Sequence, residues 1–150
     1  MKKITITMFL IALLVVLPAC SKTGATGQAT ANVQLFKSPN CGCCVGHAST
    51  LTSNDFDVEI IPTIDMASIK NKYNIPLSAQ SCHTAIIEEY VVEGHVPMEA
   101  IEKLLTEKPD IDGIALPRMP AGSPGMPGAK TEPWTIYAIK DGQTSEFMVI

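Results

Sequence analysis

Apolar and polar residues alternate in several short stretches after residue 31, and this alternation is the spacing of β-strands. It occurs in "NVQLFKS" and again in "FDVEIIP", where Pro62 ends the pattern. The run "TAIIEEYVVEGHV" predicts two further strands, with the turn between them at Glu88-Glu89 rather than at Glu93-Gly94. We therefore expect four strands before the segment that begins at Pro97.

Three other segments show the spacing of helices. The first begins in the cysteine-rich stretch near Cys43, and the second follows Asp65, a residue that can cap it. The third has Pro97 as its first helical residue and ends before Pro109. The apolar stripes that predict these helices are Val45, Ala48 and Leu51; Met66, Ile69 and Tyr73; and Met98, Ile101, Leu104 and Leu105.

The C-terminal part of the chain has a different pattern. The stretch "GIALPRMPAGSPGMPGAKTEPW", residues 113–134, is rich in Pro and Gly and predicts a long loop. A hairpin is expected over residues 134–149, because Asp141-Gly142 between two β-rich runs is a strong turn signal. The predicted order is β-α-β-α-β-β-α, followed by a Pro/Gly-rich loop and a β-hairpin extension.

A cysteine cluster, "CGCC", stands between the first predicted strand and the first predicted helix. Cys41 and Cys44 form a C-x-x-C pair, and this arrangement resembles the thioredoxin fold, so we predict an α/β, thioredoxin-like fold class. In that fold the loop before the third strand crosses in front of the C-x-x-C and usually carries a cis-proline. Here the loop carries Cys82 and His83, which we therefore expect to face the cluster across a few ångströms.

The cysteines at the start of a helix suit both disulfide exchange and metal binding, because the helix N-terminus favours the thiolate form. Cys43 and Cys82 are thiols that a dithiol redox enzyme does not need. Thiolate, imidazole and thioether are ligands for Cu(I), and crowded thiolates can bridge two or more such ions, whereas a zinc site commonly takes two separate pairs. Further candidate ligands are His47, His83, His95, Met119 and Met126.

Two other interpretations of the cysteines remain open. They can form structural disulfides in an oxidising compartment. Alternatively, Cys41 and Cys44 can serve a thiol–disulfide oxidoreductase, with Cys41 as the activated, exposed sulfur and Cys44 as the buried partner.

The first twenty residues predict an export signal. Lys2 and Lys3 precede an apolar run that is short for a membrane span, and "LPAC" then resembles a bacterial lipobox whose Cys20 would be lipidated. Residues 21–31 are rich in Ser, Thr and Gly and predict a flexible tether to a domain over residues 32–150. Ser21 after the lipidated cysteine favours the outer membrane of a Gram-negative cell; without lipidation the protein would be soluble in the periplasm.

Charge excludes one class of partner. The formal net charge of −4 becomes −6 when the signal is removed, because the signal takes Lys2 and Lys3 and no acidic residue. An acidic exported domain without a basic stripe is a poor nucleic-acid binder. We expect contact with the membrane through the lipid anchor only.

The motifs "SPNCGCC", "SCHTA", "YVVEGHVP" and "GIALPRMPAGSPGM" occur together in the order found in the CopG-like family of periplasmic copper-resistance proteins, which the chain resembles over about residues 33–150. The resemblance implies a thioredoxin-like fold, a role in handling excess copper, and Cys41, Cys43, Cys44 and Cys82 as the core ligands. It also implies redox change between Cu(I) and Cu(II) and a multinuclear site. Related chains often carry a Trp and a His further along the first helix, whereas this chain has His47 followed by "ASTL".

Together these inferences predict a metal-binding protein of the cell envelope with a Cu(I)-binding cysteine cluster. If the protein is an enzyme, the predicted activity is that of a copper oxidoreductase. Copper ions and other envelope copper-handling proteins are the expected partners.

Overall fold

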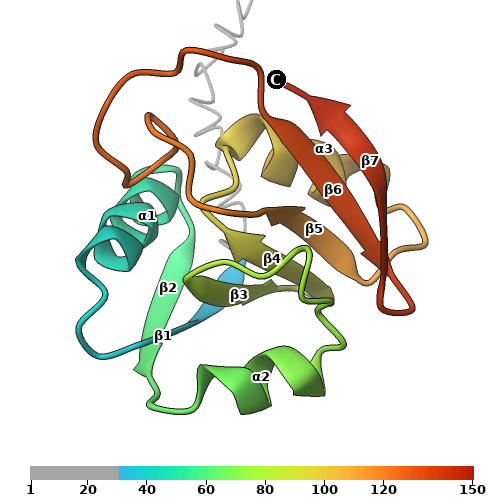
Figure 1. Ribbon diagram of the computed structural model, residues 1–150. Helices are drawn as coiled ribbons and strands as arrows, with labels where there is room; N and C mark the ends of the chain where they lie inside the picture. Colours follow the sequence, from blue (N-terminus) through green and yellow to red (C-terminus); the bar gives the residue numbers. More distant parts are fainter. Residues whose placement is uncertain (1–30) are drawn as a thin grey trace, which may run out of the picture.

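The computed structural model describes residues 31–150, so the predicted signal peptide, Cys20 and nearly all of the predicted tether lie outside the described residues. The described part folds into one seven-stranded sheet with three helices (Figure 1). None of these helices is long and apolar enough to cross a membrane. The elements are β1 (Asn32–Lys37), α1 (Gly42–Ser53), β2 (Asp57–Pro62), α2 (Met66–Lys72), β3 (His83–Ile87), β4 (Tyr90–Gly94), α3 (Met98–Glu107), β5 (Gly113–Leu116), β6 (Thr135–Lys140) and β7 (Gln143–Val149).

The strand order in the sheet is β2-β1-β3-β4-β5-β6-β7. β1 runs parallel to β2 and antiparallel to β3, and β3 and β4 form a hairpin. The predicted order β-α-β-α-β-β-α is confirmed for the first seven elements, as are the turn at Glu88-Glu89 and the hairpin around Asp141-Gly142. Asp65 caps α2 as predicted, because its side chain accepts a hydrogen bond from the Ser68 amide.

Each face of the sheet has its own apolar core. On one face, α1 and α3 pack against the strands through residues that include Leu51, Ile101 and Leu104. On the other face, the segment after α2 contributes Ile75 and Ala79 to a smaller cluster. Because alternate strand residues point to opposite faces, the side chains of His83, Ala85 and Ile87 in β3 point toward α1, whereas those of Thr84 and Ile86 point toward α2.

Three details differ from the sequence-based expectations. Residues Gly113–Leu116 were expected to be loop, but they form β5, a fully buried strand that runs parallel to β4. The C-terminal hairpin therefore continues the main sheet through β6, and the loop is shortened to residues 117–134. Pro97 is the N-cap of α3 rather than its first helical residue, because its ψ of 154° is extended. Val45, expected in the apolar stripe of α1, is 45% exposed.

Candidate metal centre

The cysteine cluster lies at the N-terminus of α1. Cys41 is the N-cap residue, with extended backbone angles, and Cys43 and Cys44 occupy the first turn. A disulfide joins Cys41 to Cys44, whereas Cys43 is free and its Sγ lies 3.5 Å from that of Cys41. Gly42 is the first residue of α1, its φ is not positive, and a Cβ there would meet no atom within 4 Å, so the structure does not require glycine at this position.

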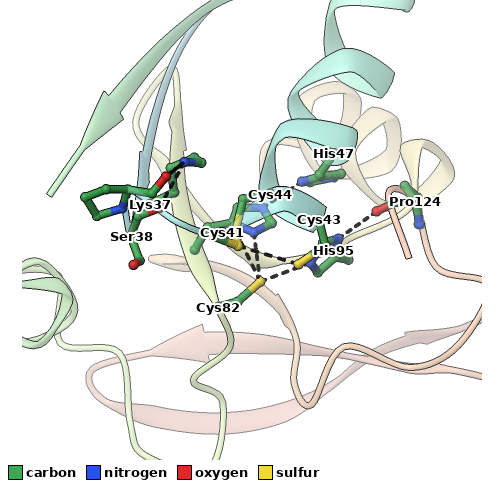
Figure 2. The surroundings of a disulfide bond; sticks show 11 residues. Lys37, Ser38, Cys41, Cys43, Cys44, His47, Cys82, His95 and Pro124 are labelled. Carbon is green, nitrogen blue, oxygen red and sulfur yellow. Dashed lines mark hydrogen bonds between the residues drawn. A yellow bond between two sulfur atoms is a disulfide. The ribbon is translucent and has the colours of Figure 1, made fainter. Parts of the chain in front are cut away.

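Cys82 approaches this cluster from the segment before β3. Its Sγ lies 3.6 Å from the Sγ of Cys44, although 38 positions separate the two residues in sequence. The Sγ atoms of Cys41, Cys43, Cys44 and Cys82 all lie within 4.8 Å of one another. Figure 2 shows Cys82 pointing at the cluster from the opposite side. The expectation that Cys82 faces the C-x-x-C therefore agrees with the geometry.

The hairpin of β3 and β4 brings two histidines to Cys82. Thr84 pairs with Glu93, so the antiparallel register continued by two residues places Cys82 opposite His95. The Cys82 Sγ lies 3.0 Å from the His95 Nε2 and 3.2 Å from the Nδ1 of the adjacent His83. The ligand atoms of Cys82, His83 and His95 form a second group within 4.8 Å. Cys82 therefore belongs to both groups.

His47 lies behind this second group and is fully buried. Its Nδ1 lies 2.7 Å from the His83 Nε2, and its Nε2 lies 3.0 Å from the Val96 carbonyl oxygen. Both ring nitrogens are thus engaged in hydrogen bonds, one of them with the histidine that lies next to Cys82. The buried face of α1 consists of Cys44, His47, Ala48 and Leu51, whose three- and four-residue spacing is that of a helix face.

Burial favours the uncharged forms of the histidines and of Cys82 in this centre. It lowers the pKa of His47 from 6.5 to about 4, and the hydrogen bond to Val96 opposes the shift only in part. It also lowers the pKa of His83 and of His95, and for His83 the two neighbouring histidines add to the effect. The pKa of the Cys82 thiol is raised to about 12, first by burial and then by the nearby Cys43. At neutral pH the three imidazoles are neutral and Cys82 is a thiol.

The loop over residues 117–134 forms one wall of the centre. Figure 1 shows this loop, in orange, passing close to α1. The Pro124 carbonyl oxygen lies 2.6 Å from the His95 Nδ1 (Figure 2). Gly125 has a φ of +82°, and a Cβ there would lie 2.5 Å from the His47 backbone nitrogen, so this contact requires glycine. In the same loop Met119 is exposed and Met126 is half-buried, and their role as ligands stays a prediction.

A buried ion pair that the sequence analysis missed holds the Cys82 segment. Glu93 is fully buried and pairs with Lys70 of α2. It also accepts hydrogen bonds from the Ser81 amide and the Thr84 hydroxyl, both 2.6 Å long. The available signal was a lone Glu inside the apolar run "YVVEGHV", since a buried carboxylate needs a partner. The pair fixes the residues on either side of Cys82 and His83.

The donor atoms fit a soft metal. Four sulfur atoms and two imidazole nitrogens meet at one place, and thiolate and imidazole suit copper and zinc. In the disulfide state Cys41 and Cys44 have no thiolate to offer, so the four-cysteine group is complete only after reduction.

The described structure is similar to two solved structures of a copper resistance protein CopG, in forms 2 and 1. Both are 36% identical to this chain, and the alignments cover 81% of this chain and 98% of those chains, with TM-scores of 0.75 and 0.74. Residues 79–126 match the sequence profile of a family described as "Protein of unknown function, DUF411". No match is found among curated proteins. The matched residues include Cys82, His83, His95 and the start of the loop that carries Pro124.

Proposed function

The chain belongs to the family of the copper resistance protein CopG, and from this premise we propose that it binds copper in the cell envelope and serves copper homeostasis and resistance. In the proposed site the thiolates of Cys41, Cys43, Cys44 and Cys82 hold Cu(I). His83 and His95 complete the ligand shell, and they are the ligands that suit Cu(II) when it forms.

The observation that carries this proposal is the convergence of four sulfur atoms from two separate segments. A dithiol enzyme requires only Cys41 and Cys44, which lie in α1 and its N-cap. Cys43 and Cys82 add two thiols that such an enzyme does not use, and both are free. The crowding of sulfur atoms supports the finer proposal that thiolates bridge more than one copper ion.

Copper loading of the four-cysteine group requires a prior reduction. An external dithiol must give two electrons and two protons to the Cys41–Cys44 disulfide and become a disulfide itself, and the two thiols formed lose their protons when they bind metal. We therefore propose that copper content depends on the redox state of the protein. The proposed change of bound copper between Cu(I) and Cu(II) is a separate step, in which each ion exchanges one electron with an external redox partner.

The location and fold family complete the proposal. A lipid anchor at Cys20 would place the domain on the periplasmic side of the envelope, with the outer membrane favoured by Ser21. The unit from β1 to α3 has the β2-β1-β3-β4 order with β3 antiparallel, and this supports a thioredoxin-like relationship. Other envelope copper-handling proteins are the proposed partners for supply and removal of the metal.

One observation favours a second function, that of a thiol–disulfide oxidoreductase. The disulfide joins Cys41 to Cys44 at a helix N-terminus, which is the arrangement that such enzymes use. On this alternative, Cys82 would not be needed for activity.

The deciding experiment purifies the protein anaerobically under reducing conditions and measures copper content and free thiols in the same sample. We expect more than one copper ion per chain, and we expect Cys82→Ser to remove most of it. The oxidoreductase alternative predicts catalytic reduction of a test disulfide and little effect of Cys82→Ser on that rate. Failure of the fully reduced protein to take up Cu(I) would refute the copper proposal.

A further inference from the structure

We infer that Cys82, His83 and His95 form a metal site that remains available while Cys41 and Cys44 are joined in the disulfide, and that His47 holds this site in its binding arrangement. The inference rests on the proposed function for the class of metal. It goes further in two ways: these three ligands bind metal without prior reduction, and His47 is a positioning residue. The ligands are two imidazole nitrogens and one sulfur atom, a set that takes Cu(II), zinc or cobalt with a coordination position left open.

The three ligand atoms are already close together in the disulfide form. The Cys82 Sγ lies within 3.2 Å of a nitrogen of each histidine. Cys82 is free, so the disulfide removes none of the three ligands. The four-cysteine group, in contrast, loses two of its four sulfur ligands to the same bond. The disulfide therefore disables the four-cysteine group but leaves all three ligands of the other group available.

The hydrogen bond to Pro124 determines which nitrogen of His95 is free. A carbonyl oxygen can only accept, so the His95 Nδ1, 2.6 Å away, carries the hydrogen and donates it. In a neutral ring the other nitrogen then has a lone pair. That nitrogen is Nε2, which lies 3.0 Å from the Cys82 Sγ. Metal-binding histidines commonly have this arrangement, with the second ring nitrogen bonded to a backbone carbonyl.

A longer chain of hydrogen bonds determines the same property of His83. The Val96 carbonyl oxygen can only accept, so the His47 Nε2 donates to it and the His47 Nδ1 carries a lone pair. The His47 Nδ1 then accepts a hydrogen bond from the His83 Nε2 at 2.7 Å. The remaining nitrogen of His83, Nδ1, therefore has its lone pair toward the Cys82 Sγ, 3.2 Å away.

Burial and the close packing of the three histidines disfavour their charged forms. Their ring centroids lie 4.8 to 5.5 Å apart, and all three side chains are buried, so two charged rings would repel at close range with little water to screen them. Two lone pairs thus face one thiol, whose single hydrogen can be donated to only one of them. A metal ion that replaces this hydrogen can use both nitrogens and the thiolate.

His47 has no lone pair left for a metal. Its Nε2 donates to Val96 and its Nδ1 accepts from His83, so its part is to orient His83 rather than to bind. Loss of such an indirect hydrogen-bond partner typically lowers metal affinity about 10- to 100-fold. The loss of metal affinity should depend on whether residue 47 keeps a hydrogen-bond acceptor where the His47 Nδ1 lies, and not only on the volume of its side chain.

The test uses Co(II) as the probe, because thiolate ligation to cobalt gives a strong near-ultraviolet charge-transfer band. Every sample is the full chain with Cys20→Ser and Cys43→Ser, which leaves Cys82 as the single free thiol once the Cys41–Cys44 disulfide has formed. Mass spectrometry verifies the disulfide and a thiol assay verifies the single thiol. We expect one Co(II) per chain with the thiolate band, and Cys82→Ser in the same background should abolish the band.

Two pairs of variants locate the ligands and the positioning residue. His95→Gln should lower the Co(II) affinity of the oxidised protein at least tenfold. His47→Leu should lower it about 10- to 100-fold. His47→Asn retains an oxygen acceptor near the position of the His47 Nδ1 and should recover most of this loss. Thermal unfolding without metal checks that both His47 variants are folded.

The outcomes separate this inference from the proposed function. An oxidised protein with no thiolate-to-cobalt band overturns the site, even if the reduced chain with Cys43 restored still takes up Cu(I). Equal affinities for folded His47→Leu, His47→Asn and the parent overturn the role of His47. Cobalt binding by the oxidised protein together with no Cu(I) uptake by the reduced chain supports the site and refutes the four-cysteine proposal instead.

Discussion

Acidification should destabilise the metal-free protein through its buried histidines. Burial lowers the pKa of His47 from 6.5 to about 4. Below pH 6.5 the unfolded chain therefore takes up a proton on this residue while the folded chain does not, so the free energy of unfolding falls as the pH falls. The stabilising difference is fully present above pH 6.5 and is lost progressively down to about pH 4.

The magnitude follows from the size of the shift. Each pH unit between these two pKa values costs about 1.4 kcal/mol, so His47 alone should remove about 2 kcal/mol between pH 7.5 and pH 5. His83 and His95 act in the same direction, because burial lowers the pKa of both. Against a total stability of about 5–15 kcal/mol for a typical domain, this loss is large.

Urea unfolding at pH 7.5 and at pH 5 measures the effect on chelator-treated protein with the disulfide intact. The matched control is His47→Leu, which lowers stability at both values but removes the titrating ring. The parent should lose about 2 kcal/mol more than His47→Leu over this interval. Equal losses in the two proteins, with unchanged denaturant dependence, would show that His47 does not resist protonation in the fold.

Three further predictions concern other parts of the structure. Because the pKa of Cys82 is raised to about 12, metal binding to the oxidised protein must displace the proton of this thiol. The Co(II) affinity should therefore rise about tenfold per pH unit between about pH 6.5 and 8. A Co(II) affinity that does not change with pH would contradict this. Glu93→Gln should lower the free energy of unfolding by about 3 kcal/mol, because it leaves the buried Lys70 ammonium without its carboxylate, and the double variant Lys70→Met/Glu93→Leu should lose less in the same denaturant assay. Gly125→Ala should cost more than about 1 kcal/mol, since its positive φ and its contact with α1 both exclude a Cβ. Gly42→Ala should cost less than this, and similar melting temperatures for the two glycine variants would count against the packing argument.

The sequence predicted the elements that have a clear period and a clear end. Pro62, the Glu88-Glu89 turn and Asp141-Gly142 each end or reverse a strand for a local reason, and all three are confirmed. β5 was missed because Gly113–Leu116 gives only four residues before Pro117, too few for a period to be recognised. Its strand character comes from pairing with β4 and β6 on both sides, which no local pattern encodes.

The sequence predicted those contacts of the site that follow from the fold topology, even between residues far apart in the chain. Cys82 was expected opposite the C-x-x-C from the predicted order of elements and its resemblance to the thioredoxin fold, and its Sγ lies 3.6 Å from that of Cys44. The predicted apolar stripe of α1 began at Val45, which is exposed, whereas the buried stripe begins at Cys44 and includes His47. The partnership of Glu93 with Lys70 could not be foreseen, because it depends on how α2 lies across the sheet.

The two-residue turn between β3 and β4 lies far from the metal centre but sets the strand register that brings His95 to Cys82. Glu88 and Glu89 are exposed and belong to neither ligand group, yet the length of their turn decides which residue stands opposite Cys82. One inserted residue would shift the register and turn the side chains of one strand to the opposite face of the sheet. Substitution of Glu89 should therefore be tolerated, as should replacement of Glu88 by Gly or Asn, which accept its φ of +53°. Insertions and deletions should not be tolerated, even though both ligand groups lie at the other end of the hairpin.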